Sequence, residues 1–243
     1  MLEIKNLTVA VGDKILLDNV SLTANAGERH IIMGRNGSGK STLLNAIMGR
    51  PGLKVTGTVR FNTIENILDL PVHERARSGI FLSMQSPPEL AGVGNAKLLQ
   101  EGLAASGRPI DLDQLLPTIN QHSRQLGLPE RWAMRALNAG ASGGERKKNE
   151  LLHLKIMNPQ LCLLDEIEAG LDVDALNTVG DMLAELASDS KKTWLLVTHS
   201  PDKLKIVPTH VHILHQGQLI KSGSADLAQQ IQANGYDALV QDQ

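Results

Sequence analysis

The chain has 243 residues, of which 42% are hydrophobic and 21% are charged, and its formal net charge is −2. This length allows one large domain or two small ones, and the near-neutral charge argues against a dedicated nucleic-acid-binding protein, which usually carries a basic excess. The single cysteine, Cys162, excludes an intrachain disulfide and any metal site built by several cysteines of this chain.

We predict neither a membrane-spanning helix nor a signal peptide in this sequence. No apolar stretch approaches the roughly 18 residues that a spanning helix needs, and the first residues lack the basic and then apolar pattern of a signal peptide. We therefore expect a cytoplasmic protein with no direct membrane insertion and no nucleic-acid partner.

The first predicted elements are two antiparallel strands around the turn Gly12-Asp13, because apolar and polar residues alternate on both sides of it. The apolar run 30–33 predicts a buried strand. Residues 40–49 predict a helix, since their apolar side chains share one face. Two further β-prone stretches follow at 55–61 and 80–82.

Between Pro87 and Pro159 the apolar spacing is helical, and we expect no strand there. Strands alternating with a helix follow, which predicts a mainly parallel sheet. The expected fold is therefore an α/β core over residues 1–86 and 159–243, with an N-terminal antiparallel β subdomain, split by a helical subdomain over residues 87–158. The later strands are expected at 161–164, 194–197 and 211–214, and the helix at 174–187.

Residues 34–41 match the phosphate-binding P-loop pattern G-x-x-x-x-G-K-[ST]. Glycines let backbone N–H groups converge on phosphate oxygens, and the following helix points its positive end at the same anion. Lys40 adds charge for the β- and γ-phosphates and Ser41 offers a hydroxyl to Mg²⁺, so we expect ATP and Mg²⁺. The expected nucleotide-binding residues are Gly34, Arg35, Asn36, Gly37, Ser38, Gly39, Lys40, Ser41 and Thr42.

A second motif is the apolar run 161–164 that ends in Asp165 and Glu166. Ligands of open α/β sheets bind at the carboxyl ends of the strands. Asp165 is therefore expected to hold Mg²⁺, and Glu166 can accept a proton from an attacking water.

Residues 142–145, Ser-Gly-Gly-Glu, have the capping-box pattern of a helix start. Their glycines also expose N–H groups that can bind an anion. We interpret the basic run 146–148 as a solvated helix face without a chemical role, in which Arg146 is partly paired with Glu150.

Three histidines, His210, His212 and His215, raise the question of a metal site, because His210 and His212 share one face of an expected strand. We favour packing as their role. We also favour core packing for Cys162, since it lies in an apolar strand.

With these motifs in this order, the chain resembles the ATPase subunits of the ABC superfamily over essentially its whole length. Residues 141–145 are similar to the signature loop, residues 169–172 to the D-loop, Gln85 to the Q-loop glutamine and His199 to the switch histidine. The resemblance implies an ATP hydrolase in which the signature loop of one subunit covers the γ-phosphate held by a second ATPase subunit. It implies catalytic roles for Glu166, His199 and Gln85, Mg²⁺ binding by Ser41, Gln85 and Asp165, and nucleotide contacts from Ser142, Gly143, Gly144, Glu145 and Asp172.

Within the superfamily, residues 140–150, 159–166 and 170–176 look similar to the SufC subfamily of the Suf iron–sulfur cluster assembly system. This similarity implies partners of the SufB and SufD type, soluble scaffolds that ATP hydrolysis would rearrange. The chain departs from the subfamily at Ala141, where Phe is usual, and at residues 167–169. Residues 9–14 offer aliphatic but no aromatic side chains where many ABC ATPases stack adenine on an aromatic ring.

Two alternatives stay open from the sequence. The ATP-hydrolysing subunit of an ABC membrane transporter would share every catalytic residue. A nucleotide-gated binding module that barely hydrolyses ATP is the second, and Glu166 argues against it, because such a module has little use for that carboxylate.

Overall fold

A computed structural model describes residues 1–236. Residues 237–243, the last residues of the predicted core segment 159–243, lie outside the described part. The central sheet has the strand order β11-β10-β3-β9-β8-β5. Its strands from β10 to β5 run parallel, as expected, and only β11, which the sequence did not predict, is antiparallel. The bounds are Arg29–Met33 for β3, Ile80–Ser83 for β5, Leu161–Asp165 for β8, Thr193–Val197 for β9, His210–His215 for β10 and Gln218–Gly223 for β11.

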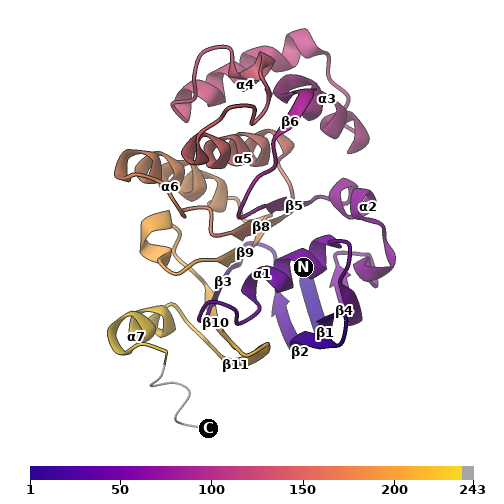
Figure 1. The fold of residues 1–243 in the computed structure, drawn as a ribbon, viewed down its shortest axis with the longest axis vertical. Coiled ribbons are helices and arrows are strands. Elements are labelled where there is room, and N and C mark those ends of the chain that lie inside the picture. Colours follow the sequence, from indigo (N-terminus) through magenta and orange to yellow (C-terminus); the bar gives the residue numbers. More distant parts are fainter. Residues whose placement is uncertain (237–243) are drawn as a thin grey trace.

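Both faces of the central sheet are covered, which explains why its strands read as continuous apolar runs. Alternate residues of β8 enter different cores: Leu161 and Leu163 pack with one cluster, and Cys162 and Leu164 with the other. In Figure 1, helices α3 to α6 lie above β8 and β9, and β1, β2 and β4 lie at the lower right, on the other side of the sheet from these helices. Cys162 has no exposed surface and its burial raises the pKa of its thiol, as expected for a packing residue.

The N-terminal β subdomain is an antiparallel sheet of β1 (Leu2–Val11), β2 (Lys14–Ala24) and β4 (Lys54–Phe61), in the order β2-β1-β4. The predicted hairpin is confirmed, with Gly12 in the left-handed conformation that its tight turn requires (φ 58°). The inner face of this sheet packs on the same core as α1 (Lys40–Met48).

The carboxyl end of α1 is held by a buried arginine. Arg75, on the short helix α2 (Val72–Arg77), donates to two main-chain carbonyls in the last turn of α1 and to two that precede α2. The accepting oxygens belong to Ala46, Ile47, Leu68 and Leu70.

The region 87–158 contains α3 (Asn95–Ala105), α4 (Leu112–Gln125) and α5 (Gly143–Met157). Our expectation that it holds no strand was wrong, because β6 (Leu90–Gly94) pairs with β7 (Ala136–Leu137). The residues of β6 are largely exposed, so no apolar alternation marks this strand in the sequence. The remaining helices are α6 (Val173–Ala187) and α7 (Asp226–Asn234), with 3₁₀ turns at Ile67–Asp69, Trp132–Met134 and Pro201–Leu204.

A buried polar network fixes α5 to the segment that follows β5. The Asn149 amide nitrogen donates to Oδ1 of Asn95 (2.9 Å) and Oδ1 of Asn138 (3.0 Å), and its oxygen accepts from Nε1 of Trp132 (2.7 Å). Asn138 donates in turn to the carbonyl of Pro88 (2.8 Å). Because such networks are rigid when every member is paired, α5 and this segment are held as one unit.

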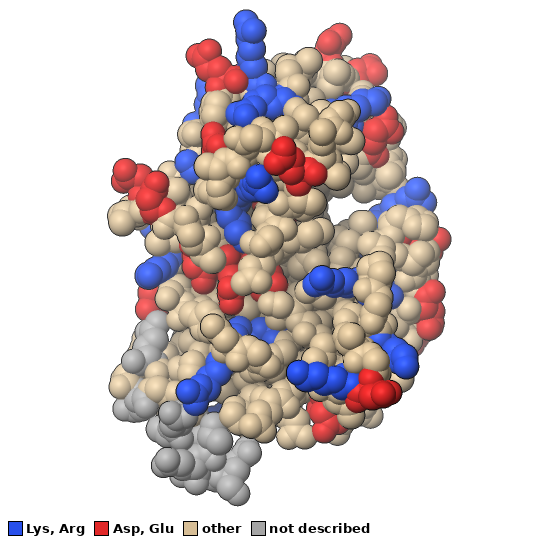
Figure 2. Space-filling model, in the orientation of Figure 1, with Lys and Arg blue, Asp and Glu red and all other residues tan. Residues whose placement is uncertain are grey.

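The surface agrees with the near-neutral composition. Figure 2 shows Lys and Arg dispersed among Asp, Glu and uncharged residues, with no continuous basic area on the face that is visible. Over the described part of the chain, every helix is too short or too polar to cross a membrane.

Candidate nucleotide site

The P-loop connects the carboxyl end of β3 to the first residue of α1, as its motif requires. Two of its glycines have no room for a side chain. A Cβ on Gly34 would lie 2.2 Å from the carbonyl oxygen of Leu214, and one on Gly39 would lie 2.6 Å from Cδ2 of Leu17. Arg35, Asn36 and Gly37 are exposed at the tip of the loop.

Lys40 is the buried cation of this loop, with 5% of its surface exposed. Its Nζ donates to the carbonyl oxygens of Gly34 (2.9 Å) and Arg35 (3.1 Å). Burial lowers the pKa of Lys40, and the charges of Glu166 and Asp165 oppose that shift. An anionic phosphate beside the ammonium group fits this arrangement, because it adds the counter-charge that carbonyl groups lack.

A second feature of the loop also fits a phosphate. The hydroxyl of Ser38 is buried and has no hydrogen-bond partner among the described residues. Such orphaned groups are rare in proteins unless a ligand or water pairs with them. A phosphate oxygen would accept its hydrogen bond.

The hydroxyl of Ser41 donates to Oδ1 of Asp165 across 3.0 Å, which joins the start of α1 to the end of β8. Asp165 is only 3% exposed, and burial raises the pKa of its carboxyl group while the Ser41 hydrogen bond lowers it. Ser41, Gln85 and Asp165 line one pocket. Hydroxyl, amide and carboxylate oxygens are the donors that Mg²⁺ takes in proteins, so this set fits the ion.

Glu166 lies between the side chains of Gln85 and His199. Its Oε2 accepts from Nε2 of Gln85 (2.7 Å), and its Oε1 is 3.4 Å from Nε2 of His199. The backbone of Glu166 is left-handed (φ 46°), and its N–H donates to Val197 on β9. A non-glycine residue in this conformation carries strain of about 1 kcal/mol or more, which proteins concentrate at functional positions. Glu166 thus contacts each of the other two residues expected to be catalytic.

Lys147 is a buried residue near the carboxylates of the site that the sequence did not predict. We expected residues 146–148 to be a solvated face, but Lys147 is 4% exposed and donates from Nζ to the carbonyl of Met84 (3.0 Å). Burial lowers the pKa of Lys147, while nearby carboxylates including Glu150 and Asp165 raise it. The helical spacing of Lys147 with Leu151, four residues later, is the signal that could have found it.

The expected pairing of Arg146 with Glu150 was also wrong. Arg146 pairs instead with Glu89, at 3.2 Å, and donates to the carbonyl of Ala141. Glu150 turns toward β5, where one of its carboxylate oxygens accepts from the backbone N–H of Met84 (3.3 Å). Helical spacing allowed the first pairing, but the tertiary structure provides other partners for both residues.

Glu168 and Thr198 form another contact that the sequence did not predict. The hydroxyl of Thr198 donates to a carboxylate oxygen of Glu168, and the other oxygen is buried without a partner among the described residues. Burial raises the pKa of Glu168. The departure at residues 167–169 therefore lies directly beside the segment that carries His199.

Residues far from the P-loop in the sequence complete its surroundings. The N–H of Gly34 donates to the hydroxyl of Tyr236 (3.2 Å). Lys14 and Leu16 line the pocket that residues 36, 37 and 39–42 form with Gln85 and Glu166. Leu16, on β2, gives this pocket an aliphatic wall; of residues 9–14, only Lys14 lines it.

The signature-like loop forms the predicted capping box at the start of α5. Oγ of Ser142 accepts from the N–H of Glu145 (3.2 Å), and Oε2 of Glu145 accepts from the N–H of Ser142 (2.8 Å). Asp172 caps α6 by accepting from the N–H of Ala175 (2.8 Å). Within the described chain, neither residues 142–145 nor Asp172 line the P-loop pocket, so one chain does not bring these two groups together.

Comparisons with known proteins agree with this geometry. Residues 17–169 match the family model described as ABC transporter. The chain is 41% identical to vegetative protein 296 of Bacillus subtilis, over 99% of this chain and 94% of that protein. It is 40% identical to the probable ATP-dependent transporter SufC of Escherichia coli, over the full length of both.

Solved structures show the same fold with 25% sequence identity. The dimeric structure of a bacterial ABC transporter cassette matches with a TM-score of 0.78, over 93% of this chain and 99% of that one. A dimeric post-hydrolysis state of an ATP-binding cassette, bound to ADP and phosphate, matches with a TM-score of 0.76 over the same shares. The chain therefore belongs to the ABC transporter ATP-binding family, as a SufC-type ATPase that uses ATP and Mg²⁺.

Proposed function

We propose that this ATPase drives a conformational change in a SufB/SufD-type scaffold during iron–sulfur cluster assembly in the cytoplasm. The observation that carries the proposal is the 40% identity to Escherichia coli SufC, which extends over the full length of both chains. The ATP-hydrolysing subunit of an ABC membrane transporter remains the alternative, because the same nucleotide site would serve it.

The P-loop residues are assigned to the triphosphate, with Lys40 supplying the charge. Ser41, Gln85 and Asp165 are assigned to Mg²⁺, which neutralises phosphate oxygens when it is bound. Glu166 accepts the proton of the attacking water, and its contacts with Gln85 and His199 hold the carboxylate in position.

A second ATPase subunit completes the site in this proposal. Gly143 and Gly144 open α5 between the two capping-box residues, whose N–H groups pair with each other's side chains, and a helix N-terminus attracts anions. Residues 142–145 do not line the P-loop pocket of their own chain, whereas the similar cassettes were solved as dimers. The signature loop and Asp172 of one subunit are therefore assigned to the nucleotide held by the other.

Residues 87–158 are assigned as the subdomain that docks the scaffold. Exposed apolar side chains gather on the segment that surrounds and follows Gln85: Met84 is 46% exposed, Leu90 44% and Val93 37%. The buried Asn149 network ties this segment to the helix that follows the signature loop. A partner docked at this segment is therefore connected both to Gln85 in the P-loop pocket and to the signature loop at the start of α5.

The test combines the purified chain with the SufB and SufD proteins of its own host. We expect a stable complex and an ATPase rate at least about tenfold above that of the isolated chain. Val93→Ser is expected to weaken the complex, whereas Val207→Ser, which removes an equally apolar but distant exposed side chain (72% exposed), is expected to leave it unchanged.

The transporter alternative predicts a different outcome. If the chain ignores SufB and SufD and co-purifies from host membranes with a polytopic protein, the scaffold proposal is wrong. Its nucleotide-site residues would then power a transporter.

A further inference from the structure

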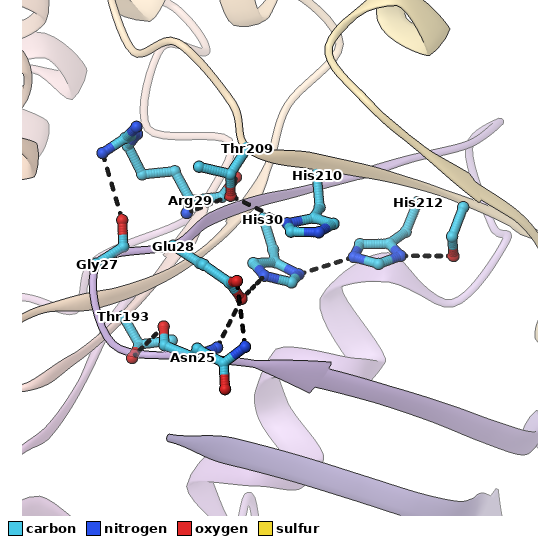
Figure 3. Close-up of polar contacts among 10 residues, drawn as sticks. Asn25, Gly27, Glu28, Arg29, His30, Thr193, Thr209, His210 and His212 are labelled. Carbon is cyan, nitrogen blue, oxygen red and sulfur yellow. Dashed lines mark hydrogen bonds and ion pairs between the residues drawn. The ribbon is translucent and has the colours of Figure 1, made fainter.

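Three histidines and one carboxylate gather at the end of the central sheet that lies opposite the P-loop. His30 is near the start of β3 and His210 is the first residue of β10, and these two residues are direct partners in the parallel register. Their rings stack with centroids 4.5 Å apart. Figure 3 shows Glu28 and His212 on either side of the His30 ring, with dashed contacts to both of its nitrogens.

The ligand atoms of Glu28, His30 and His210 all lie within 4.8 Å of one another. Metal bonds of about 2.0–2.2 Å bring the ligand atoms of one ion to within roughly 3–4 Å. Glu28 and His210 are only partly buried, so their side chains have room to turn toward one ion; the stacked His210 ring must rotate for its nitrogen to face the same ion as His30. The same partial exposure gives an ion access from solvent.

On the side of its ring away from Glu28, His30 is held by a row of hydrogen bonds through His212 to Ser222. Nδ1 of His30 is 2.8 Å from Nε2 of His212, whose Nδ1 is 2.7 Å from the hydroxyl of Ser222. Metal-binding histidines commonly donate their second ring N–H to such a partner, which fixes the tautomer and the orientation of the ring.

The protons of His30, His212 and Ser222 can rearrange so that Nε2 of His30 is free to bind a metal ion. When Nε2–H of His30 donates to Glu28, Nε2–H of His212 donates to Nδ1 of His30 and Ser222 donates to His212. When a metal takes Nε2 of His30, both rings change tautomer: Nδ1–H of His30 donates to His212, and Nδ1–H of His212 donates to Ser222. Each imidazole keeps one proton in both arrangements, and a serine hydroxyl serves as donor or acceptor.

We propose that Glu28, His30 and His210 bind one divalent first-row transition metal ion, such as Zn²⁺ or Co²⁺, with His212 and Ser222 orienting His30. Two imidazole nitrogens and one carboxylate oxygen suit these ions, whereas Mg²⁺ and Ca²⁺ prefer oxygen ligands alone. Packing, the role we favoured for His210 and His212, does not require Glu28 beside His30. His215, on the same strand, is not part of the cluster.

This metal site is separate from the nucleotide site and independent of the proposed scaffold function. Residues 30 and 34 are four strand positions apart, which corresponds to about 13 Å. Loss of metal binding therefore leaves the assignment of the P-loop untouched, and the reverse also holds.

The experiment titrates Zn²⁺ alone into the full chain by calorimetry, and Co²⁺ alone by visible absorption. We expect one tight site, with Co²⁺ d–d bands typical of a low-coordinate nitrogen and oxygen environment. Glu28→Gln and His210→Ala are each expected to weaken Zn²⁺ binding at least about tenfold. Glu28→Gln is nearly isosteric and keeps an oxygen for the N–H of Asn25, so it tests the site without a large change in packing.

His215→Ala is the matched control, because it removes a half-buried histidine from the same strand. It is expected to bind Zn²⁺ like the unmodified chain. Absence of a tight site in the unmodified chain, or equal Zn²⁺ affinity in Glu28→Gln, His210→Ala and His215→Ala, would overturn the proposal. The histidines would then be hydrogen-bonded packing groups only.

Discussion

Gln85 donates a hydrogen bond from its Nε2 to Oε2 of Glu166 across 2.7 Å. This contact joins the segment after β5, where exposed apolar side chains gather, to the carboxylate that follows β8. A displacement of that segment therefore moves a direct partner of Glu166. In the proposed function, this contact is a short mechanical route from the docked scaffold to the carboxylate assigned to activate the water.

The first prediction concerns Glu166→Gln. We expect this variant to bind ATP with an affinity within about threefold of the unmodified chain, because the substitution keeps the size of the side chain. Its turnover is expected to fall by about 10²–10⁴-fold, since an amide cannot accept the proton of the water. Single-turnover hydrolysis measures this directly, with Glu65→Gln, an exposed carboxylate, as the control. An unchanged single-turnover rate contradicts the base assignment.

The second prediction concerns Lys40→Ala, which removes the buried cation of the P-loop. We expect ATP affinity to fall at least about tenfold, because the charge-assisted contact with the phosphates is lost. Calorimetry with ATP and Mg²⁺ provides the measurement. Lys97→Ala, at a side chain 63% exposed on α3, is expected to bind ATP normally. Equal affinity in both variants would show that Lys40 does not contact the triphosphate.

The third prediction concerns the buried network in region 87–158. Asn149→Ala leaves Nε1 of Trp132 and the oxygens of Asn95 and Asn138 with fewer partners. We expect a loss of about 2–4 kcal/mol in the free energy of unfolding, measured by urea denaturation. Asn120→Ala, at an exposed position of α4, is expected to change stability by less than about 0.5 kcal/mol. Similar losses in the two variants would contradict a specific role for the network.

The fourth prediction concerns pH. Burial raises the pKa of Glu150 from 4.5 to about 7, although the N–H of Met84 and the charge of Lys147 oppose the shift. Between these two values the folded chain binds more protons at Glu150 than the unfolded chain, so this residue lowers stability as the pH rises through that window.

Glu150→Gln removes this titrating group, and it provides the test. The variant is expected to match the unmodified chain near pH 4 and to exceed it by about 1–3 kcal/mol near pH 8. Urea unfolding at several pH values measures the difference. A variant that loses stability relative to the unmodified chain as the pH rises would show that the sign is wrong.

The parallel core could be predicted because buried parallel strands leave a direct mark on the sequence. The run 161–164 is apolar at every position and leads into two carboxylates. The run 194–197 is also apolar at every position. The strand β6 left no such mark, because its residues are exposed and pair through the backbone. Hydrophobic pattern therefore identifies strands that the core buries and misses those held by main-chain hydrogen bonds alone.

The P-loop and the carboxylates at 165–166 could be identified from motifs, and their roles stay predictions. No motif marks Lys147; its helical spacing with Leu151 points to a buried position, but its contact with the carbonyl of Met84 is not visible in the sequence. The pairing of His30 with His210 depends on the register of two strands that are far apart in the chain. Tertiary structure alone specifies such contacts.

The position of β3 has a consequence for how the chain is made. Both sheet neighbours of this strand, β9 and β10, belong to the last third of the chain, and the hydroxyl that contacts Gly34 belongs to residue 236. During synthesis, the P-loop emerges from the ribosome long before any of these partners. Because such distant contacts form slowly and late, the nucleotide-binding loop takes its final shape only after residues 193–236 have been made.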